Sequence, residues 1–294
     1  MLNLRFAWLE ITGKCQLACD HCYADSGPKG TDGVMQSSDW IRVIDDIVQL
    51  GGWMVQFIGG EQTLHRSLPV LVHHALGRGL EVEVFSNFTH VSPQLWELFA
   101  QPGVRLATSY YSDDAAQHAA ITKGRGSHAR TRANVSEALR RRIPLRVGLI
   151  NVHDGQRVEQ ARAELEALGV SEIGVDRVRQ VGRGVRNQAP SLDQLCGNCG
   201  NGRLAVAPDG TVWPCVFSRW LPVGNARQSP LAEIMGGRAM VESTAQLATR
   251  FGSRVSSLPC VPDMCDPQCG PSCSPACRPA SNCRPVGACV PTEY

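Results

Sequence analysis

Three cysteines lie close together near the N-terminus, and their spacing suggests an inorganic centre. Three residues separate Cys15 from Cys19 and two separate Cys19 from Cys22, so one short loop can bring three thiols together. Thiolates are soft ligands that favour iron–sulfur clusters or zinc over hard cations. A structural zinc ion would need a fourth ligand, and His21 is the only other soft donor in the run. Three thiolates on a four-iron cluster would leave one iron open to bind another ligand.

The context of these cysteines also points to chemistry. Residues 6–12 form an apolar segment that predicts a strand directly before them. Parallel α/β folds place reactive groups on loops at the carboxyl ends of strands. A second apolar segment, residues 53–58, leads into Gly59-Gly60-Glu61. Taken alone, this tripeptide is typical of an ordinary turn, and the three cysteines are compatible with a zinc knuckle.

In this order, the two motifs resemble the radical S-adenosylmethionine (radical SAM) superfamily. The resemblance implies that the open iron of a [4Fe–4S] cluster chelates SAM, and that one electron cleaves SAM to a 5′-deoxyadenosyl radical. It also implies that Gly59, Gly60 and Glu61 hold the SAM amino group, with Gly60 allowing close backbone approach to the ligand. Ser86 and Asn87 follow the third expected strand, where family members contact the methionyl or ribose groups of SAM.

Alternating strand-like and helix-like segments must position these motifs. The expected strands cover residues 6–12, 53–58, 81–85, 104–108, 145–152 and 172–178, and the expected helices begin near residues 37, 67, 92, 131 and 158. Six β/α repeats imply right-handed crossovers and a parallel sheet. Periodicity leaves a doubly wound sheet and a barrel open. The resemblance implies an α/β fold with a partial (β/α)6 TIM-like barrel, open on one side.

Polar side chains near the carboxyl ends of the later strands are further candidates for the site, because barrel enzymes place their chemistry at that face. Tyr110 and Tyr111 follow the fourth strand, and Asp176 lies near the end of the sixth. These three are the candidate catalytic residues. Asn151 on the fifth strand and Arg179 after the sixth are candidate cofactor-binding residues.

A second group of cysteines flanks an expected hairpin. Residues 204–213 predict two short strands that turn at residues 208–210. Cys199 precedes this hairpin, Cys215 follows it, and Cys196 lies three residues before Cys199. Thiolates at the two ends of a hairpin can therefore meet at one centre. A zinc ribbon and an iron–sulfur site are both compatible with this arrangement.

The later part of the chain resembles the SPASM or twitch extension, which contains auxiliary iron–sulfur clusters. The resemblance rests on Cys199, Gly210, Cys215 and the Gly224-Asn225 pair. It implies that Cys260 and Cys265 complete the ligands of an auxiliary [4Fe–4S] cluster. The tail departs from the family, because cysteines recur every four residues from Cys265 to Cys277 among prolines. We therefore expect one auxiliary cluster rather than two.

We expect two domains. Residues 1–187 would form the radical SAM core, and residues 188–294 would form a small cysteine-rich auxiliary-cluster domain with a Cys/Pro-rich tail. Residues 181–184, Val-Gly-Arg-Gly, lie near this boundary. They resemble the segment that follows the sixth strand in SPASM-type enzymes.

Composition excludes several classes of protein. The formal net charge of +2 argues against a dedicated nucleic-acid binder. No apolar run is long enough to cross a bilayer and no secretory signal is evident, so we expect a cytoplasmic protein without membrane contact. Thirteen cysteines, with none between Cys22 and Cys196, indicate metal ligation in a reducing compartment rather than an evenly distributed disulfide framework.

The resemblance implies a radical SAM enzyme that removes hydrogen from a substrate C–H bond with electrons from a flavodoxin- or ferredoxin-type donor. We favour a ribosomally made peptide as the substrate, modified by a crosslink, a thioether or an epimerisation. The few residues before Phe6 leave no room for a leader-binding domain, which weakens that expectation. The alternatives are an epimerase or dehydrogenase of an aminoglycoside or aminocyclitol, and a non-enzymatic zinc-binding protein.

Overall fold

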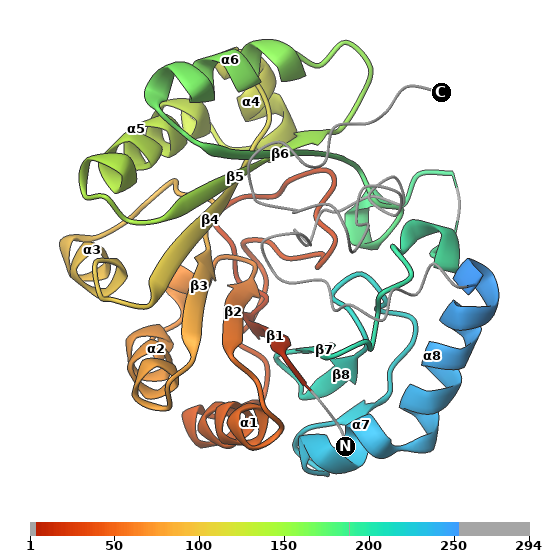
Figure 1. Cartoon of the computed structure of the whole chain (residues 1–294). Coiled ribbons are helices and arrows are strands. Elements are labelled where there is room, and N and C mark those ends of the chain that lie inside the picture. The colour runs from red at the N-terminus through yellow and green to blue at the C-terminus, as the bar shows by residue number, and fades with distance from the viewer. Residues whose placement is uncertain (1–3, 188, 253–294) are drawn as a thin grey trace, which may run out of the picture.

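The computed structural model describes residues 4–187 and 189–252, and its first part alternates strands with helices (Figure 1). The strands are β1 (Phe6–Thr12), β2 (Met54–Gly59), β3 (Glu81–Phe85), β4 (Val104–Tyr110), β5 (Leu145–Asn151) and β6 (Glu172–Arg177). The helices are α1 (Ser37–Gln49), α2 (Leu68–Gly77), α3 (Pro93–Phe99), α4 (Ala115–Thr122), α5 (Ser127–Arg140) and α6 (Val158–Leu168). These six strands pair in parallel in the order β6-β5-β4-β3-β2-β1, which confirms the predicted α/β fold.

The sheet curves around a central space, as Figure 1 shows, with α1, α2, α3, α5 and α6 on its outer side. Among the described residues the sheet ends at β6 on one side and at β9 on the other, so the barrel is partial. This curvature directs the loops after the strands toward one shared region. The loop between β1 and α1, which contains the first three cysteines, is one of them.

Helix α1 illustrates how local sequence specifies these elements. Trp40, Val43, Ile44 and Ile47 recur at helical spacing, and all four are buried. The chain leaves the helix at Gly51, whose φ of 87° favours a residue without a side chain. One face of the helix is thus committed to the core, and its end is defined by a glycine.

Strands β1 and β2 are buried on both faces, as is typical of a covered parallel sheet, whereas the edge strand β6 is partly exposed. On β1, Ala7, Leu9 and Ile11 contribute to the core between sheet and helices. Phe6 and Trp8 point to the opposite face and belong to a second cluster, together with residues from the later part of the chain. The inner face of the barrel is therefore partly filled by the extension.

The extension adds to the same sheet. Strand β7 (Arg203–Val206) pairs in parallel with β1, and β8 (Thr211–Trp213) and β9 (Gly224–Asn225) follow as antiparallel strands. The predicted hairpin is thus confirmed. Helices α7 (Leu231–Gly236) and α8 (Arg238–Phe251) come next, and the short 3-10 helices are η1 (Gln62–Leu64), η2 (Gly182–Gly184) and η3 (Leu192–Gln194). Because the sheet is continuous from β1 to β7, it marks no break at residue 187, and the domain boundary stays a prediction.

One helix of the β/α repeats was not expected from the sequence. Helix α4 buries only His118, Ile121 and Thr122, so its apolar face is too weak to be recognised by periodicity. Helix α5 begins at Ser127, four residues before the expected start near residue 131. None of the helices in the described part of the chain is long and apolar enough to cross a membrane.

A buried ion cluster lies inside the barrel, one layer from the strand ends toward their N-termini. Glu83 on β3 is fully buried and receives two hydrogen bonds, of 2.8 and 2.7 Å, from the guanidinium of Arg146 on β5. Arg105 lies 3.2 Å from the same carboxylate, and the Gln56 amide donates to it. Burial favours the neutral carboxyl, but the charges and hydrogen bonds of Arg146 and Arg105 outweigh it and lower the pKa of Glu83.

Candidate active site

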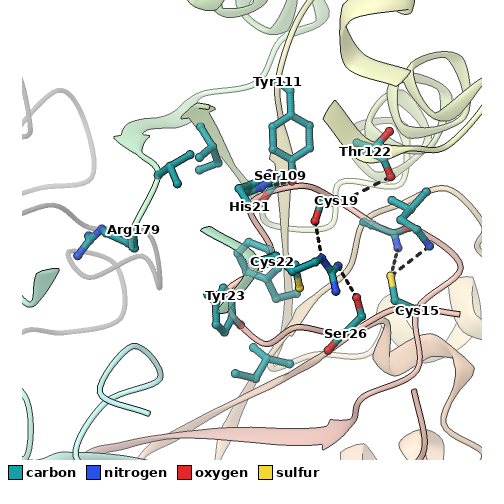
Figure 2. Close-up of a pocket in the computed structure, with 18 of the residues that line it drawn as sticks. Cys15, Cys19, His21, Cys22, Tyr23, Ser26, Ser109, Tyr111, Thr122 and Arg179 are labelled. Carbon is teal, nitrogen blue, oxygen red and sulfur yellow. Dashed lines mark hydrogen bonds between the residues drawn. The ribbon is translucent and has the colours of Figure 1, made fainter. Parts of the chain in front are cut away.

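The first cysteine group surrounds a pocket at the carboxyl ends of the strands (Figure 2). Cys15, Cys19 and Cys22 all line it, and the cavity has a volume of about 970 Å³ that includes open solvent. Ile58 and Phe85, from β2 and β3, form part of its wall. The expected placement of the cysteines on a loop beyond β1 is thus what the structure shows.

Backbone hydrogen bonds hold the cysteine loop against its neighbours. The N–H groups of Ala18 and Asp20 donate to the carbonyls of Thr122 and Ile121 at the end of α4, each at 3.2 Å. Within the loop, the Cys22 N–H donates to the Cys19 carbonyl at 3.3 Å. Helix α4, which sequence analysis missed, therefore supports the loop directly.

The glycine pair after β2 allows the second strand to approach this loop. The N–H of Gly60 donates to the Thr12 carbonyl at 2.7 Å. A Cβ on Gly60 would lie 2.1 Å from the Lys14 carbonyl oxygen, and a Cβ on Gly59 would lie 2.4 Å from that of Thr12. Both glycines also line the pocket. The close contact that demands a glycine at position 60 is with the backbone of Lys14, and the expected approach of a ligand to Gly60 stays a prediction.

Glu61 is used within the protein. Its buried carboxylate accepts hydrogen bonds from the Ser86 hydroxyl at 2.8 Å, the Asn87 N–H at 2.8 Å and the Thr63 hydroxyl at 2.7 Å. Burial raises the pKa of Glu61 although these hydrogen bonds oppose it. Glu61 and Ser86 are not among the residues that line the pocket, so they act behind its wall, and their contact with SAM stays a prediction.

Asn87 is the polar residue of this turn that reaches the pocket. Its amide nitrogen lies 3.6 Å from the Cys15 sulfur and 3.3 Å from the Gln16 side-chain oxygen. The Leu17 N–H also donates to the Cys15 sulfur, at 3.4 Å. These donors orient Cys15 from two sides, and donors of this kind favour the thiolate form.

Burial favours the protonated form of the three thiols. Burial raises the pKa of Cys15 to about 12 and also raises those of Cys19 and Cys22, although the charge of Arg183 opposes the shift for the last two. Within residues 4–187 and 189–252, no three His, Cys, Asp or Glu side chains are arranged to hold a single metal ion. The three-thiol donor set beside a large cavity fits a multi-iron cluster, whose binding would release these protons.

Two of the candidate residues at the barrel rim line this pocket. The Tyr111 hydroxyl lies 3.2 Å from His21 Nε2, and Arg179 donates to the Gln194 carbonyl at 2.5 Å and to Asp176 at 3.0 Å. Tyr111 and Arg179 are both visible in Figure 2. Asp176 is therefore one contact away from the pocket, where it orients Arg179. The exposed Asn151 is not among the lining residues.

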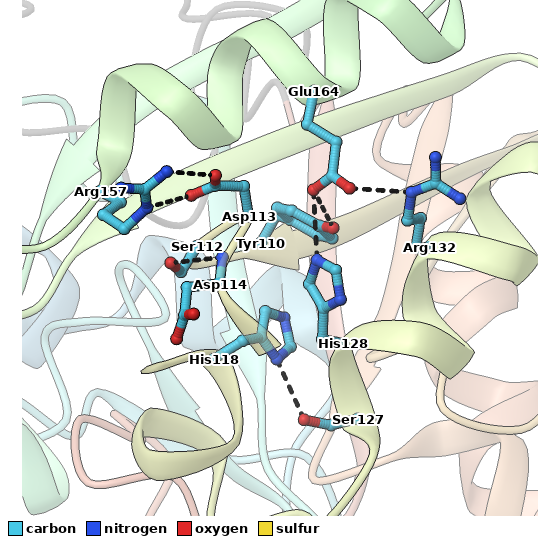
Figure 3. Close-up of polar contacts among 10 residues, drawn as sticks. All are labelled: Tyr110, Ser112, Asp113, Asp114, His118, Ser127, His128, Arg132, Arg157 and Glu164. Atoms are coloured by element: carbon cyan, nitrogen blue, oxygen red, sulfur yellow. Dashed lines mark hydrogen bonds and ion pairs between the residues drawn. The ribbon is translucent and has the colours of Figure 1, made fainter. Parts of the chain in front are cut away.

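Tyr110 points to the opposite side of its strand. Its hydroxyl donates to Glu164 on α6 at 2.7 Å, and His128 and Arg132 bond the same carboxylate at 3.2 and 2.8 Å (Figure 3). Tyr110 belongs to the core between sheet and helices and is absent from the pocket lining. Successive side chains of a strand alternate between faces, so the structure does not bring Tyr110 to the pocket.

The second cysteine group lies in the cluster of side chains on the inner face of the sheet. Hydrogen bonds with Cys196 and Cys215, followed by burial, raise the pKa of Cys199 well above its ordinary value. The hydrogen bond from Cys199 lowers the pKa of Cys215, as expected when one thiol donates to a neighbouring thiolate. The predicted proximity of these three thiols is thus observed. Cys260 and Cys265 lie outside the described residues.

Several residues that line the pocket were not selected from the sequence. His118 comes from the unexpected helix α4, is 1% exposed, and has a pKa lowered to about 3 by burial. Phe217 follows Cys215 by two residues, and its ring lies 5.2 Å from that of Tyr23, which follows Cys22. Arg183 belongs to the Val-Gly-Arg-Gly segment, which the sequence singled out without a role.

Comparison with known families decides what this arrangement is. A family model described as the radical SAM superfamily matches residues 9–168, more than half of the chain. The chain belongs to the radical SAM superfamily. A second model, described as an iron–sulfur cluster-binding domain (SPASM), matches residues 196–274. Membership implies SAM and a [4Fe–4S] cluster as cofactors and, from the SPASM match, auxiliary iron–sulfur clusters, which replaces the zinc alternative.

Curated relatives of this radical SAM protein include PqqA peptide cyclases. The protein from Xanthomonas campestris pv. campestris is 30% identical over 192 residues, which cover 64% of this chain and 51% of the relative. The protein from Rhodopseudomonas palustris is 25% identical over 193 residues, with coverage of 64% and 51%. The chain therefore spans about half the length of the curated relatives it matches.

Solved structures share the fold of this radical SAM protein at low identity. Streptococcus suis SuiB bound to the precursor peptide SuiA gives a TM-score of 0.68 at 10% identity, covering 82% of this chain and 66% of SuiB. Native anSMEcpe with bound AdoMet and the Cp18Cys peptide gives 0.63 at 12% identity, covering 82% of each chain. At these identities the likeness establishes the fold.

Proposed function

We propose that this protein is a radical SAM enzyme that modifies a ribosomally made peptide during maturation of a natural product. The observation on which the proposal depends is the position of Cys15, Cys19 and Cys22 around an open pocket at the carboxyl ends of the parallel strands. The similarity to PqqA peptide cyclases supports a peptide substrate. The shared fold of SuiB, solved with its precursor peptide, is compatible with it.

In this proposal the residues of the pocket have separate roles. Cys15, Cys19 and Cys22 hold the radical cluster, and Asn87 and Arg179 contact SAM. When bound, the cluster and SAM supply a carbon radical that takes a hydrogen atom from a substrate C–H bond. The protein contributes binding, orientation and exclusion of water.

The walls of the pocket suit a reactive intermediate. Tyr23, Phe85 and Phe217 contribute aromatic rings, and Ile58 and Ile150 contribute aliphatic side chains. Apolar walls exclude water from the vicinity of the reacting atoms. Tyr111 is the hydroxyl group that we propose for contact with the substrate, since it lines the same pocket.

The second cysteine group extends the proposal to electron transfer. Cys196, Cys199 and Cys215 would supply three ligands of an auxiliary [4Fe–4S] cluster, and Cys260 and Cys265 are our candidates for the fourth. The auxiliary cluster would accept an electron from the substrate or bind the substrate. A flavodoxin- or ferredoxin-type donor in the reducing cytoplasm would complete the system.

The test is anaerobic co-expression with a precursor peptide encoded beside this gene. We expect the wild-type protein to change the peptide, by loss of two hydrogens for a crosslink or by deuterium uptake without such a loss for an epimerisation. The matched control changes Cys15, Cys19 and Cys22 together to Ala. It should leave the peptide unmodified, lack about four irons per chain and form no 5′-deoxyadenosine with dithionite.

Two results would contradict the proposal at different levels. Wild-type production of 5′-deoxyadenosine by the triple variant would refute radical SAM chemistry at these cysteines. An unchanged peptide, together with SAM-dependent epimerisation or dehydrogenation of an aminoglycoside or aminocyclitol, would instead assign the enzyme to the sugar alternative.

A further inference from the structure

Arg183 joins two segments that are far apart in the sequence. It lies in η2, after the sixth strand, yet its side chain reaches the cysteine loop that follows β1. The residue lines the pocket, and 29% of its side chain is exposed. Neither the cysteine motif nor the glycine pair after β2 assigns a role to Arg183.

Four contacts connect Arg183 to the cysteine loop. Its Nε donates to the Cys19 carbonyl at 2.9 Å, and one terminal nitrogen donates to the Ser26 carbonyl at 2.5 Å. The other terminal nitrogen pairs with Asp25 at 2.9 Å, and the backbone N–H donates to the Cys22 carbonyl at 3.0 Å. One residue therefore bonds the carbonyls of two of the three cysteines.

The glycines on either side of Arg183 permit this approach. Gly182 has a φ of 56°, and a Cβ there would lie 2.4 Å from the Tyr23 carbonyl oxygen and 2.5 Å from that of Cys22. A Cβ on Gly184 would lie 2.2 Å from the Arg179 carbonyl oxygen. Close backbone contacts therefore require a glycine on each side of Arg183.

We propose that Arg183 is a positioning residue that holds the loop of Cys19 and Cys22 in its cluster-binding conformation and places a fixed positive charge beside the cluster. The inference rests on the proposed function, because it assumes a cluster at the three cysteines. Arg183 bonds backbone and not sulfur, so it acts through the ligands. Through Arg183, residues 181–184, which lead into the extension, become part of the structure that holds the radical cluster.

The geometry of these contacts requires arginine and not merely a positive charge. The ion pair with Asp25 has little weight, because the Asp25 side chain is 72% exposed and exposed pairs contribute little. The two carbonyl acceptors of the guanidinium, Cys19 and Ser26, lie in different directions, and a planar guanidinium can reach both whereas an ammonium is a single point. Replacement of Arg183 by Lys therefore keeps the charge and loses part of the hydrogen bonding.

The charge should also affect the cluster's reduction potential. Reduction adds negative charge to an iron–sulfur cluster, so a nearby cation stabilises the reduced form and raises the midpoint potential. A neutral residue at this position should make the potential more negative. The charge effect and the loop-holding effect can therefore be separated by comparing two substitutions.

The experiment compares Arg183→Lys and Arg183→Gln with the control Arg186→Gln in the anaerobically reconstituted full-length protein. Arg186 is an exposed arginine three positions further along, and its replacement removes the same charge while the hydrogen bonds of Arg183 to the cysteine loop stay in place. The readouts are the rate of iron release to a chelator and the midpoint potential from an EPR-monitored titration. Both Arg183 variants should release cluster iron on the order of tenfold faster, as is typical when a group that orients metal ligands is lost.

The midpoint potential distinguishes the two variants. The midpoint potential should become more negative in Arg183→Gln, stay near the wild-type value in Arg183→Lys, and shift less in Arg186→Gln than in Arg183→Gln. Wild-type rates of iron release and wild-type potentials in both Arg183 variants would overturn the inference. A shift of the midpoint potential in Arg186→Gln as large as that in Arg183→Gln would also overturn the inference, because it would show an unspecific effect of net charge.

A combined variant separates this inference from the proposed function. In the background with Cys15, Cys19 and Cys22 changed to Ala, Arg183→Gln should not alter the retention of the remaining auxiliary iron. Faster loss of iron in that background would overturn the inference, since Arg183 would then act on the other cluster. If the triple variant itself loses no iron, the proposed function fails instead.

Discussion

At the scale of single residues, close contacts between backbone segments shape the site more than the chemistry of its side chains does. Gly60 is needed because the Lys14 carbonyl occupies the space of its Cβ. Glu61, the one charged residue of that motif, accepts hydrogen bonds from Asn87 and Ser86 and so fixes the turn after β3. The motif therefore joins three strand ends before any ligand is bound.

Gly60→Ala tests this reading of the glycine. The new Cβ would lie 2.1 Å from the Lys14 carbonyl oxygen, so the cysteine loop or the end of β2 must move. We expect a loss of about 1–3 kcal/mol in the free energy of unfolding, as for other overpacked sites, and reduced iron content after reconstitution. Both quantities are measurable on the purified protein, by denaturant unfolding and by iron analysis.

Gly174→Ala is the matched control for that substitution. Gly174 lies on β6, and a Cβ there would meet no heavy atom within 4 Å. The Gly174→Ala variant should retain the wild-type iron content. If Gly60→Ala retained its iron as well but bound SAM weakly, the glycine would serve the ligand and not the loop.

At the scale of the elements, the strands position the pocket through a polar layer beneath it. Glu83 on β3 receives hydrogen bonds from Arg146 on β5 and from Gln56 on β2, and lies 3.2 Å from Arg105 on β4. Four neighbouring strands are thus joined inside the barrel. Parallel strands whose ends are fixed in this way present their loops at constant relative positions.

Glu83→Gln should weaken this layer strongly. The substitution removes the buried carboxylate charge beside Arg146 and Arg105, while Arg105 keeps its ion pair with Glu172. Breaking a buried pair by removing one partner costs about 3–5 kcal/mol. Chemical denaturation of the variant measures the loss. The control is Glu166→Gln on α6, whose partner Arg162 is 3.6 Å away and whose side chain is 56% exposed. That change should cost less than about 1 kcal/mol, and equal losses in the two variants would contradict the argument.

The pKa of Glu83 also predicts how stability depends on pH. Its pKa is lower in the folded protein than the ordinary value of 4.5, so its ionised form stabilises the fold above that value. This contribution should decline as the pH falls below 4.5 and through the folded-state pKa. The wild-type protein should therefore lose more stability than Glu83→Gln between neutral pH and acid.

At the scale of the whole molecule, the core and the extension share one sheet. Strand β7 pairs with β1, and the second cysteine group contacts the inner face of the barrel through the side-chain cluster that includes Phe6 and Trp8. The ring contact between Tyr23 and Phe217 brings together the two loops that contain cysteines. The two cysteine groups are therefore held in one rigid framework and not on separate, independently placed units.

Truncation after Gly270 tests which cysteines belong to the auxiliary cluster. Cys199 and Cys215 flank a hairpin and leave coordination positions that we assign to Cys260 and Cys265. The shortened protein should hold about eight irons per chain, four for each of two clusters, by iron analysis after anaerobic reconstitution. About four irons would assign the auxiliary ligands to the far tail. About twelve in the full-length protein would show a second auxiliary cluster.

The sequence by itself indicated the class of chemistry, through its family resemblance, and the succession of the strands along the chain. Cys15, Cys19 and Cys22 lie in one loop, and the spacing of candidate ligands within a loop is a local property that needs no tertiary information. Strand positions followed from segments rich in apolar residues, because strands covered by helices bury apolar side chains on at least one face. Tyr110 shows the limit of this reasoning, since its position after the fourth strand indicated the rim but not the face on which it lies.

Only the tertiary structure decided which distant residues complete the site. Helix α4 has too weak an apolar face to be recognised, yet its carbonyls bind the cysteine loop. Arg183 contacts Cys19 across 164 positions in the sequence, and no local pattern encodes such a contact. Curvature of the sheet brings these segments to one pocket, because the carboxyl ends of parallel strands converge only when the sheet bends around a centre.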